Sequence, residues 1–173
     1  MRSFYIYISI SLILIGCISC GLQQVRYSFD GASISPDVKT FSVEYFPNKA
    51  PLVVPTLSDT FTDKLKNYLR TKTSLKEVTE NNGDIRFEGQ ITEYSQRPME
   101  IQRDEIAASN RLTITVRVRY TNTKDDKFDF DSSFSHYADY SIDVDYNSVE
   151  ESLIEEITDK IIEDIYNKAL VNW

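Results

Sequence analysis

The stretch RLTITVRVRY (residues 111–120) decides the fold, because its side chains alternate between apolar and polar. The apolar members are Leu112, Ile114, Val116, Val118 and Tyr120, and the polar members are Arg111, Thr113, Thr115, Arg117 and Arg119. A period of two residues is typical of a β-strand with one buried face and one wet face. The stretch therefore predicts a strand that presents its arginines and threonines on the outer side of a sheet.

Alternation on both sides of this stretch predicts further strands. Residues 84–94 alternate around Ile85 and Phe87, and residues 128–134 follow the polar turn 122–126. Strands joined in succession by turns are antiparallel. Nearer the N-terminus, residues 39–46 predict another strand, and residues 75–78 are a candidate for a short bridge.

Two stretches have helical spacing. Leu57, Phe61, Leu65 and Leu69 recur every four residues after Thr56, which is a candidate N-cap, and this helix should end near residues 71–74. Apolar residues recur in the same way from Val149 to Leu170. Asn147 and Ser148 are candidate caps for this second helix, with Ser148 and Glu151 at the spacing of a capping box.

The predicted order of elements is β-α-β-β-β-α. Both helical stripes need apolar cover, and one sheet face can supply it for both. We therefore expect an α+β two-layer sandwich, with two helices packed on one face of a four-stranded, mostly antiparallel sheet. The opposite face should be wet or used for binding.

The first twenty residues have the layout of an export signal. Arg2 precedes an apolar run at residues 4–16, which at thirteen residues is shorter than the about 20 that span a bilayer. Residues 14–17 (LIGC) resemble a lipobox, in which cleavage precedes a lipidated cysteine. We expect a signal peptide at 1–16, a lipidated tether at 17–38 and one α+β domain at 39–173. Cys17 is the candidate lipid attachment site, with Cys20 as the alternative, and an ordinary cleaved signal is a further alternative.

Composition excludes several classes of function. The chain has 19 Lys and Arg against 27 Asp and Glu, a net charge of −8, which repels nucleic acid. Both cysteines precede the expected domain, so its fold does not depend on disulfides.

No constellation in the sequence points to catalysis. His136 is the single histidine, it shares the parity of Phe130 and Phe134, and we expect it beside the core. The chain has no Gly-rich phosphate loop and no G-x-S-x-G motif. Asp125, Asp126 and nearby acids lack the spacing of a known Ca²⁺ loop. We expect a protein that is not an enzyme and has no catalytic residue, metal, cofactor or nucleotide site.

Two groups of residues are candidates for binding. Arg86, Arg111, Arg117 and Arg119 should share the outer sheet face, where guanidinium groups could bind an anionic ligand or a partner. Alternatively, they pair with acidic neighbours such as Glu88.

The second group lies in residues 95–110, a connection longer than a hairpin requires. Its candidate contacts are Arg97, Pro98, Met99 and Ile101. Docking on a partner and folding over the chain's own sheet are both open.

Three separated stretches resemble one family. They are YSFDGASISPDVKTFSVEYFPNKAPLVVPTLSDTFTDKL (27–65), PMEIQRDEIAASNRLTITVRVRY (98–120) and VEESLIEEITDKIIEDIYNKALVNW (149–173). Together they resemble the Bacteroidota branch of the lipopolysaccharide-assembly lipoprotein family, LptE. The family fold has two helices on a four-stranded sheet. Relatives place the lipidated cysteine directly before a glycine, which favours Cys20, whereas the lipobox favours Cys17.

The resemblance implies a lipid-anchored protein in the inner leaflet of the outer membrane, facing the periplasm. It implies that the protein plugs an LptD-type β-barrel, assists barrel assembly and takes part in lipopolysaccharide transport to the outer leaflet. No lipopolysaccharide-contact residue is carried over to this sequence. The alternative function is a stand-alone periplasmic binding module for an anionic ligand or another envelope protein.

Overall fold

The structure is a computed structural model that describes residues 34–52, 54–79, 81–99 and 108–171. The expected signal peptide, Cys17, Cys20 and Ile101 lie outside the described residues. The elements in chain order are β1 (Thr40–Val43), α2 (Leu57–Lys72), β2 (Lys76–Glu77), β3 (Ile85–Pro98), β4 (Ser109–Asn122), the short 3-10 helix η1 (Asp126–Phe128), β5 (Phe130–Ser141), α3 (Tyr146–Tyr166) and the π-helical turn η2 (Asn167–Val171).

The described strands form one mixed sheet in the order β2-β1-β3-β4-β5. β4 is antiparallel to both β3 and β5, as expected, but β1 runs parallel to both β2 and β3. The expectation of four strands was wrong by one, because the candidate bridge at 75–78 pairs with β1 as β2. β1 is parallel to β3 because the connection between them passes through α2, which returns the chain to the same end of the sheet.

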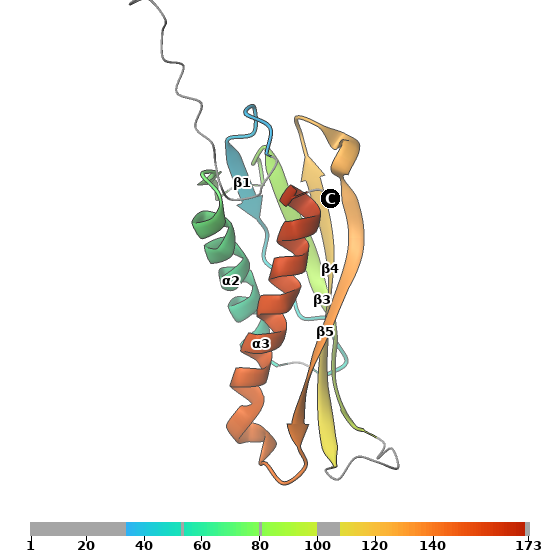
Figure 1. The fold of residues 1–173 in the computed structure, drawn as a ribbon. Helices are drawn as coiled ribbons and strands as arrows, with labels where there is room; N and C mark the ends of the chain where they lie inside the picture. The colour runs from blue at the N-terminus through green and yellow to red at the C-terminus, as the bar shows by residue number, and fades with distance from the viewer. Residues whose placement is uncertain (1–33, 53, 80, 100–107, 172–173) are drawn as a thin grey trace, which may run out of the picture.

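Both helices cover the same face of the sheet, which confirms the two-layer α+β class (Figure 1). α3 packs on β4 and β5, and α2 packs beside α3 over β1. The predicted stripes are the buried ones: Phe61, Leu65 and Leu69 are fully buried on α2, as are Ile157 and Ile161 on α3. The apolar residues of β4 that alternate in the sequence are all buried on this face.

Several predicted boundaries were wrong because contacts from other elements moved them. β3 continues to Pro98 and β4 begins at Ser109, so residues 95–98 and 109–110 of the expected 95–110 connection are paired strand. β5 begins at Phe130, not at Phe128, and runs to Ser141, because it pairs with β4 over its whole length.

The helix caps also differ from the prediction. α3 begins at Tyr146, and Asp145 caps it by accepting from the backbone N–H of Asn147. The ring of Tyr146 lies 5.5 Å from that of Tyr140, which holds this earlier turn against the sheet. Thr56 does occupy the N-cap position of α2, although its side chain makes no capping bond.

Asp84 joins three segments at one end of the sheet. Its Oδ2 accepts from the backbone N–H of Lys39 at 2.9 Å and from both the N–H and Oγ1 of Thr40 at 3.0 Å. Its Oδ1 lies 3.0 Å from Nζ of Lys124, in the turn between β4 and β5. The hydrogen bond from Lys39 and the ammonium of Lys124 hold the pKa of the Asp84 carboxyl well below its usual range.

Gly89 allows Phe46 to lie against β3. A Cβ at residue 89 would lie 2.1 Å from the carbonyl oxygen of Arg117 and 2.7 Å from the Phe46 ring. Phe46 is fully buried and meets Phe61 of α2 edge-on at 5.1 Å. The missing side chain therefore permits close contacts with both β4 and the segment that leads to α2.

We predict that Asp84→Asn lowers the free energy of unfolding at pH 7, and that the difference from the wild type shrinks as the pH falls below about 4. The carboxyl pKa is lower in the folded protein than its unfolded value of about 3.9. The carboxylate of Asp84 therefore stabilises the fold fully at a pH above its unfolded-state pKa. This stabilisation is lost as the pH falls towards its folded-state pKa. Urea unfolding at a series of pH values checks this, with exposed Asp143→Asn as the control. A difference that is the same at pH 3 and pH 7 would contradict it.

We predict that Gly89→Ala destabilises the domain by about 1–3 kcal/mol, because a backbone atom of β4 occupies the position of the new methyl group. Gln90→Ala, at the next residue but on the other face, should change stability by less than about 0.5 kcal/mol. Equal urea midpoints for the two variants would contradict the prediction, because the close contact at residue 89 would then not affect stability.

Candidate functional site

The face of the sheet opposite the helices, here called the outer face, carries the sequence-predicted arginines. Strand register assigns its members. They are Arg86, Glu88, Gln90, Glu93, Ser95 and Arg97 on β3, Arg111, Thr113, Thr115, Arg117 and Arg119 on β4, and Asp131, Ser133, Ser135, Tyr137 and Asp139 on β5. A β-bulge between Ile91 and Glu93 shifts the parity of β3, so that Tyr94 beyond it is buried on the helix side.

Asp131 holds two of the arginines together. Its Oδ1 accepts from Nε of Arg117 at 2.7 Å, and its Oδ2 accepts from Nη2 of Arg117 at 3.1 Å and Nη2 of Arg119 at 3.3 Å. The hydrogen bonds from Arg117 lower the pKa of Asp131, and Asp131 in turn raises the pKa of Arg117. Both arginine side chains are more than half exposed, so water screens these pairs.

Arg111 makes a separate ion pair further along β4. Its Nε and Nη2 donate to the two carboxylate oxygens of Asp139 at 2.7 and 2.8 Å, and its guanidinium lies 3.5 Å from the centre of the Tyr137 ring. The bidentate hydrogen bond lowers the pKa of Asp139. Planar stacking of this kind fixes the guanidinium more firmly than an ion pair alone.

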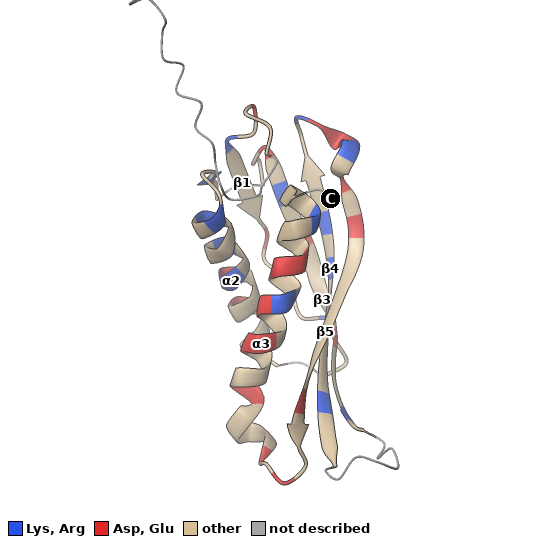
Figure 2. Ribbon diagram, in the orientation of Figure 1, with Lys and Arg blue, Asp and Glu red and all other residues tan. Residues whose placement is uncertain are grey.

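The four predicted arginines therefore form two groups. Arg111 lies about 26 Å from Arg119 along β4, at ~3.3 Å per residue, and its direct neighbour across the sheet is Arg97. Arg86 lies near Arg119, and its Nε donates to the carbonyl oxygen of Gly83 at 3.3 Å. Figure 2 shows the basic residues of β4 as separate blue segments towards the two ends of the strand.

A cavity of about 280 Å³ lies on the outer face, between β3 and the arginines Arg117 and Arg119 of β4. Its lining comprises Arg117, Arg119, Asp131, Glu88, Gly89 and Gln90, which gives two positive and two negative side chains. Because the charges balance, an anion at the exposed guanidinium groups would compete with the carboxylate of Asp131 and would be repelled by Glu88. The sequence suggested Glu88 as a pairing partner and missed Asp131 and Asp139. Their alternation with Phe130, Phe134 and Ala138 was visible, but only the register assigned each to its arginine.

The described residues of the predicted loop lie at one end of the long β3–β4 hairpin. Arg97 and Pro98 belong to β3, and the N–H of Met99 donates to the carbonyl oxygen of Ser109 at 2.8 Å. This end of the hairpin and the end near residue 34 lie at opposite ends of the molecule (Figure 1).

His136 lies on the helix side of β5, at the predicted parity. Its ring is about one-third exposed, and Nε2 lies 2.6 Å from Oδ2 of Asp164 on α3. The described residues contain no group of three or more His, Cys, Asp or Glu placed to hold a metal ion. None of the described helices has both the length and the apolar character needed to cross a membrane.

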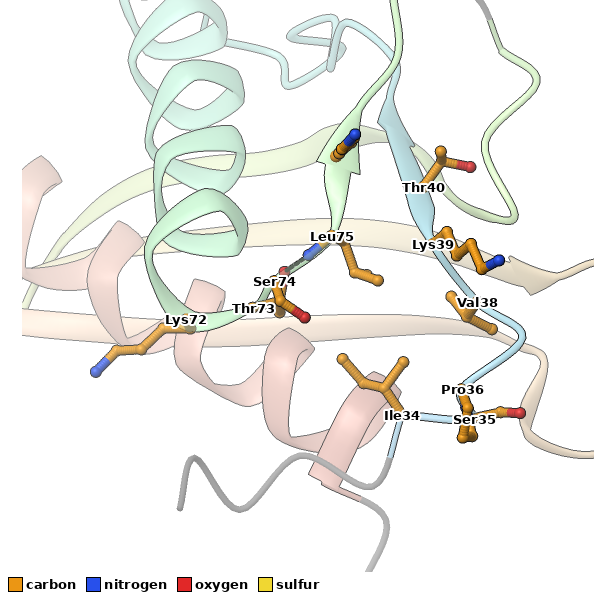
Figure 3. Close-up of a pocket in the computed structure, with 11 residues that line it drawn as sticks. Ile34, Ser35, Pro36, Val38, Lys39, Thr40, Lys72, Thr73, Ser74 and Leu75 are labelled. Atoms are coloured by element: carbon orange, nitrogen blue, oxygen red, sulfur yellow. Dashed lines mark hydrogen bonds between the residues drawn. The ribbon is translucent and has the colours of Figure 1, made fainter. Parts of the chain in front are cut away.

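A second cavity, of about 650 Å³, lies where the described chain begins. In Figure 3 the side chains of Ile34, Val38 and Leu75 surround it, while Lys39 and Lys72 point outwards to opposite sides. The space thus has an apolar centre, and these two ammonium groups do not converge on a shared ligand position.

Solved structures with the same fold include three bacterial proteins. A minor lipoprotein from Acinetobacter baumannii is 19% identical, with 76% of this chain and 91% of that chain covered and a TM-score of 0.50. A hypothetical protein from Chlamydia trachomatis is 11% identical, with 76% and 97% covered and a TM-score of 0.51. Uncharacterized lipoprotein B from Nitrosomonas europaea is 14% identical, with 74% and 79% covered and a TM-score of 0.50. At these identities the likeness shows the fold alone.

No relative among the curated proteins matches the chain. The family model for lipopolysaccharide assembly, LptE, matches residues 38–169. This range contains every described strand and α-helix. The chain therefore belongs to the LptE lipopolysaccharide-assembly family.

Proposed function

We propose that this protein is an outer-membrane lipoprotein that plugs an LptD-type β-barrel, assists the assembly of that barrel and takes part in lipopolysaccharide transport to the outer leaflet. The observation that carries the proposal is the family match over residues 38–169. In this proposal residues 1–16 are the signal peptide, and Cys17 or Cys20 carries the lipid that holds the protein in the inner leaflet, facing the periplasm. Membership of the Bacteroidota branch stays a prediction.

The shape of the domain supports a role as a plug. β3 and β4 each have 14 residues, which corresponds to about 46 Å of extended chain. The helices cover one face of this long sheet, and the outer face remains polar. A long domain with a polar face suits the water-filled interior of a large barrel, which is also polar.

The charge balance of the outer face supports a structural role over catalysis or tight capture of small anions. Arg111, Arg117 and Arg119 are all paired within the domain. Such pairs place fixed hydrogen-bonding groups at a polar surface without a large local charge. We therefore propose a non-enzymatic subunit whose outer face and hairpin end contact other macromolecules.

We propose that the hairpin end, through Arg97, Pro98, Met99 and Ile101, contacts the barrel. Purification of the tagged full-length protein in mild detergent should recover a large β-barrel protein in about equal amount. Met99→Ser combined with Ile101→Ser should reduce the recovered barrel several-fold, because two apolar contacts are removed.

Leu52→Ser is the control, since it replaces an exposed apolar side chain outside the β3–β4 hairpin. Recovery of the wild type without a barrel in several detergents would count against the proposed function. Full recovery of the barrel with the hairpin variant would instead remove only the proposed contact.

The alternative function is a stand-alone periplasmic module that would bind an anionic ligand in the cavity beside Arg117 and Arg119. The balanced charges lead us to predict that the full-length protein binds inorganic phosphate more weakly than about 1 mM, a binding free energy smaller than ~4 kcal/mol. Arg117→Gln with Arg119→Gln should leave this weak binding unchanged, as should Arg70→Gln on α2. Titration calorimetry with inorganic phosphate checks this prediction. Saturable binding with a dissociation constant below about 1 mM, lost only in the Arg117 and Arg119 double variant, would establish the binding module instead.

A further inference from the structure

The outer edge of β5 is a long, regular sheet edge. β5 is the last strand in the sheet order, and no segment of the described chain pairs with its far side. It has 12 residues and pairs with β4 from Phe130 to Ser141 without a break in register. The sheet's other edge is β2, which has two residues.

The backbone groups that face this edge follow from one hydrogen bond. The N–H of Ile142 donates to the carbonyl oxygen of Ala108 at 3.2 Å, directly beyond the pair Ser109 and Ser141. In antiparallel pairing, hydrogen-bonded and non-hydrogen-bonded pairs alternate along the ladder. The even-numbered residues of β5 therefore bond to β4. The N–H and C=O groups of residues 131, 133, 135, 137 and 139 point away from β4, towards the edge.

The edge has few of the features that usually block strand addition, because its acidic residues, Asp131 and Asp139, both form ion pairs with arginines of β4. Natural sheets protect their edges with lysine, proline, bulges or very short strands. β5 contains no Lys, Arg or Pro, and its pairing with β4 shows no bulge. The two-residue β2 is protected by its length, whereas β5 is not.

A groove borders the same edge on the helix side. It is a cavity of about 590 Å³ whose lining includes Phe128, Phe130, Phe134 and Lys168. Nζ of Lys168 lies 4.8 Å from the centre of the Phe130 ring and donates to Oγ of Ser132 at 2.7 Å. Side chains of an added strand would alternate between the two faces, so those on the helix side would meet this aromatic groove.

We propose that the β5 edge binds an extended segment of a second protein, which adds a strand to the sheet and places an apolar side chain in the groove beside Phe130 and Phe134. Main-chain hydrogen bonds supply affinity in this mode, and side-chain pockets supply specificity. The charged side chains of β5 on the outer face are Asp131 and Asp139, which stay 30% and 41% exposed beside their arginine partners, so Lys or Thr suits the added strand on that side. The inference does not depend on the proposed function.

A second copy of this chain fits the edge poorly. A net charge of −8 opposes self-association. Antiparallel pairing of two β5 edges centred on Ser135 would also place Asp131 of each copy opposite Asp139 of the other, and like charges directly opposite each other are destabilising.

The test uses the full-length protein in detergent and a synthetic peptide of ten residues that alternates Val or Leu with Lys or Thr. Residue-resolved amide hydrogen exchange should slow at least tenfold at residues 133, 135 and 137 when the peptide is added, and should not change in β2. The same peptide with a central proline should give no protection. Absence of protection by the alternating peptide at millimolar concentration would overturn the proposal.

Ser133→Pro and Ser133→Ala form a matched pair of variants. Proline removes the N–H that points to the edge, without breaking a hydrogen bond to β4, and should weaken peptide binding at least tenfold, while alanine should not. If the proline variant does not fold, the exchange pattern of the wild type still decides the outcome. Protection of the edge without peptide that grows with protein concentration would identify a second copy as the occupant, and would overturn a heterologous partner.

Discussion

The alternation of side chains along β4 is the constraint on which the other elements depend. Its buried face holds five apolar residues between β3, β5 and α3, so a shift of one residue in register would expose all five and bury arginine instead. That cost fixes the pairing of β3 and β5 at the same time. The ion pairs of Arg111 and Arg117 with β5 are consequences of this register, and they add directional contacts to it.

The helices bury one face of the sheet and leave the outer face polar. The two faces therefore have different roles in the domain. The helix side supplies the stability of the domain through apolar burial. The outer face supplies paired guanidinium and carboxylate groups whose charges nearly cancel. A surface of this kind keeps hydrogen-bonding groups in fixed positions while attracting few small ions, which is more useful in a subunit that contacts other macromolecules than in a receptor for free anions.

The two ends of the sheet differ from each other, and so do its two edges. At one end Asp84 draws β1, β3 and the β4–β5 turn together, and at the other the β3–β4 hairpin extends to Arg97 and Pro98. The short β2 closes one edge, while the long β5 presents regularly spaced backbone groups beside an aromatic groove. In this member of a lipopolysaccharide-assembly family, the domain thus has a packed core on the helix side and exposed polar and edge surfaces around it.

The sequence by itself determined the element types, the helices on one side and the buried residues, because apolar periodicity states which face of each element avoids water. The three stretches that resemble LptE likewise led to the family without coordinates. Only the tertiary structure decided that residues 75–78 pair with β1, that Tyr146 belongs to α3, and that Asp131 and Asp139 are the partners of the arginines. Each of these depends on register or on a contact between residues distant in the chain. A local pattern carries no information about which neighbour will lie opposite, since that is settled only when the whole core packs.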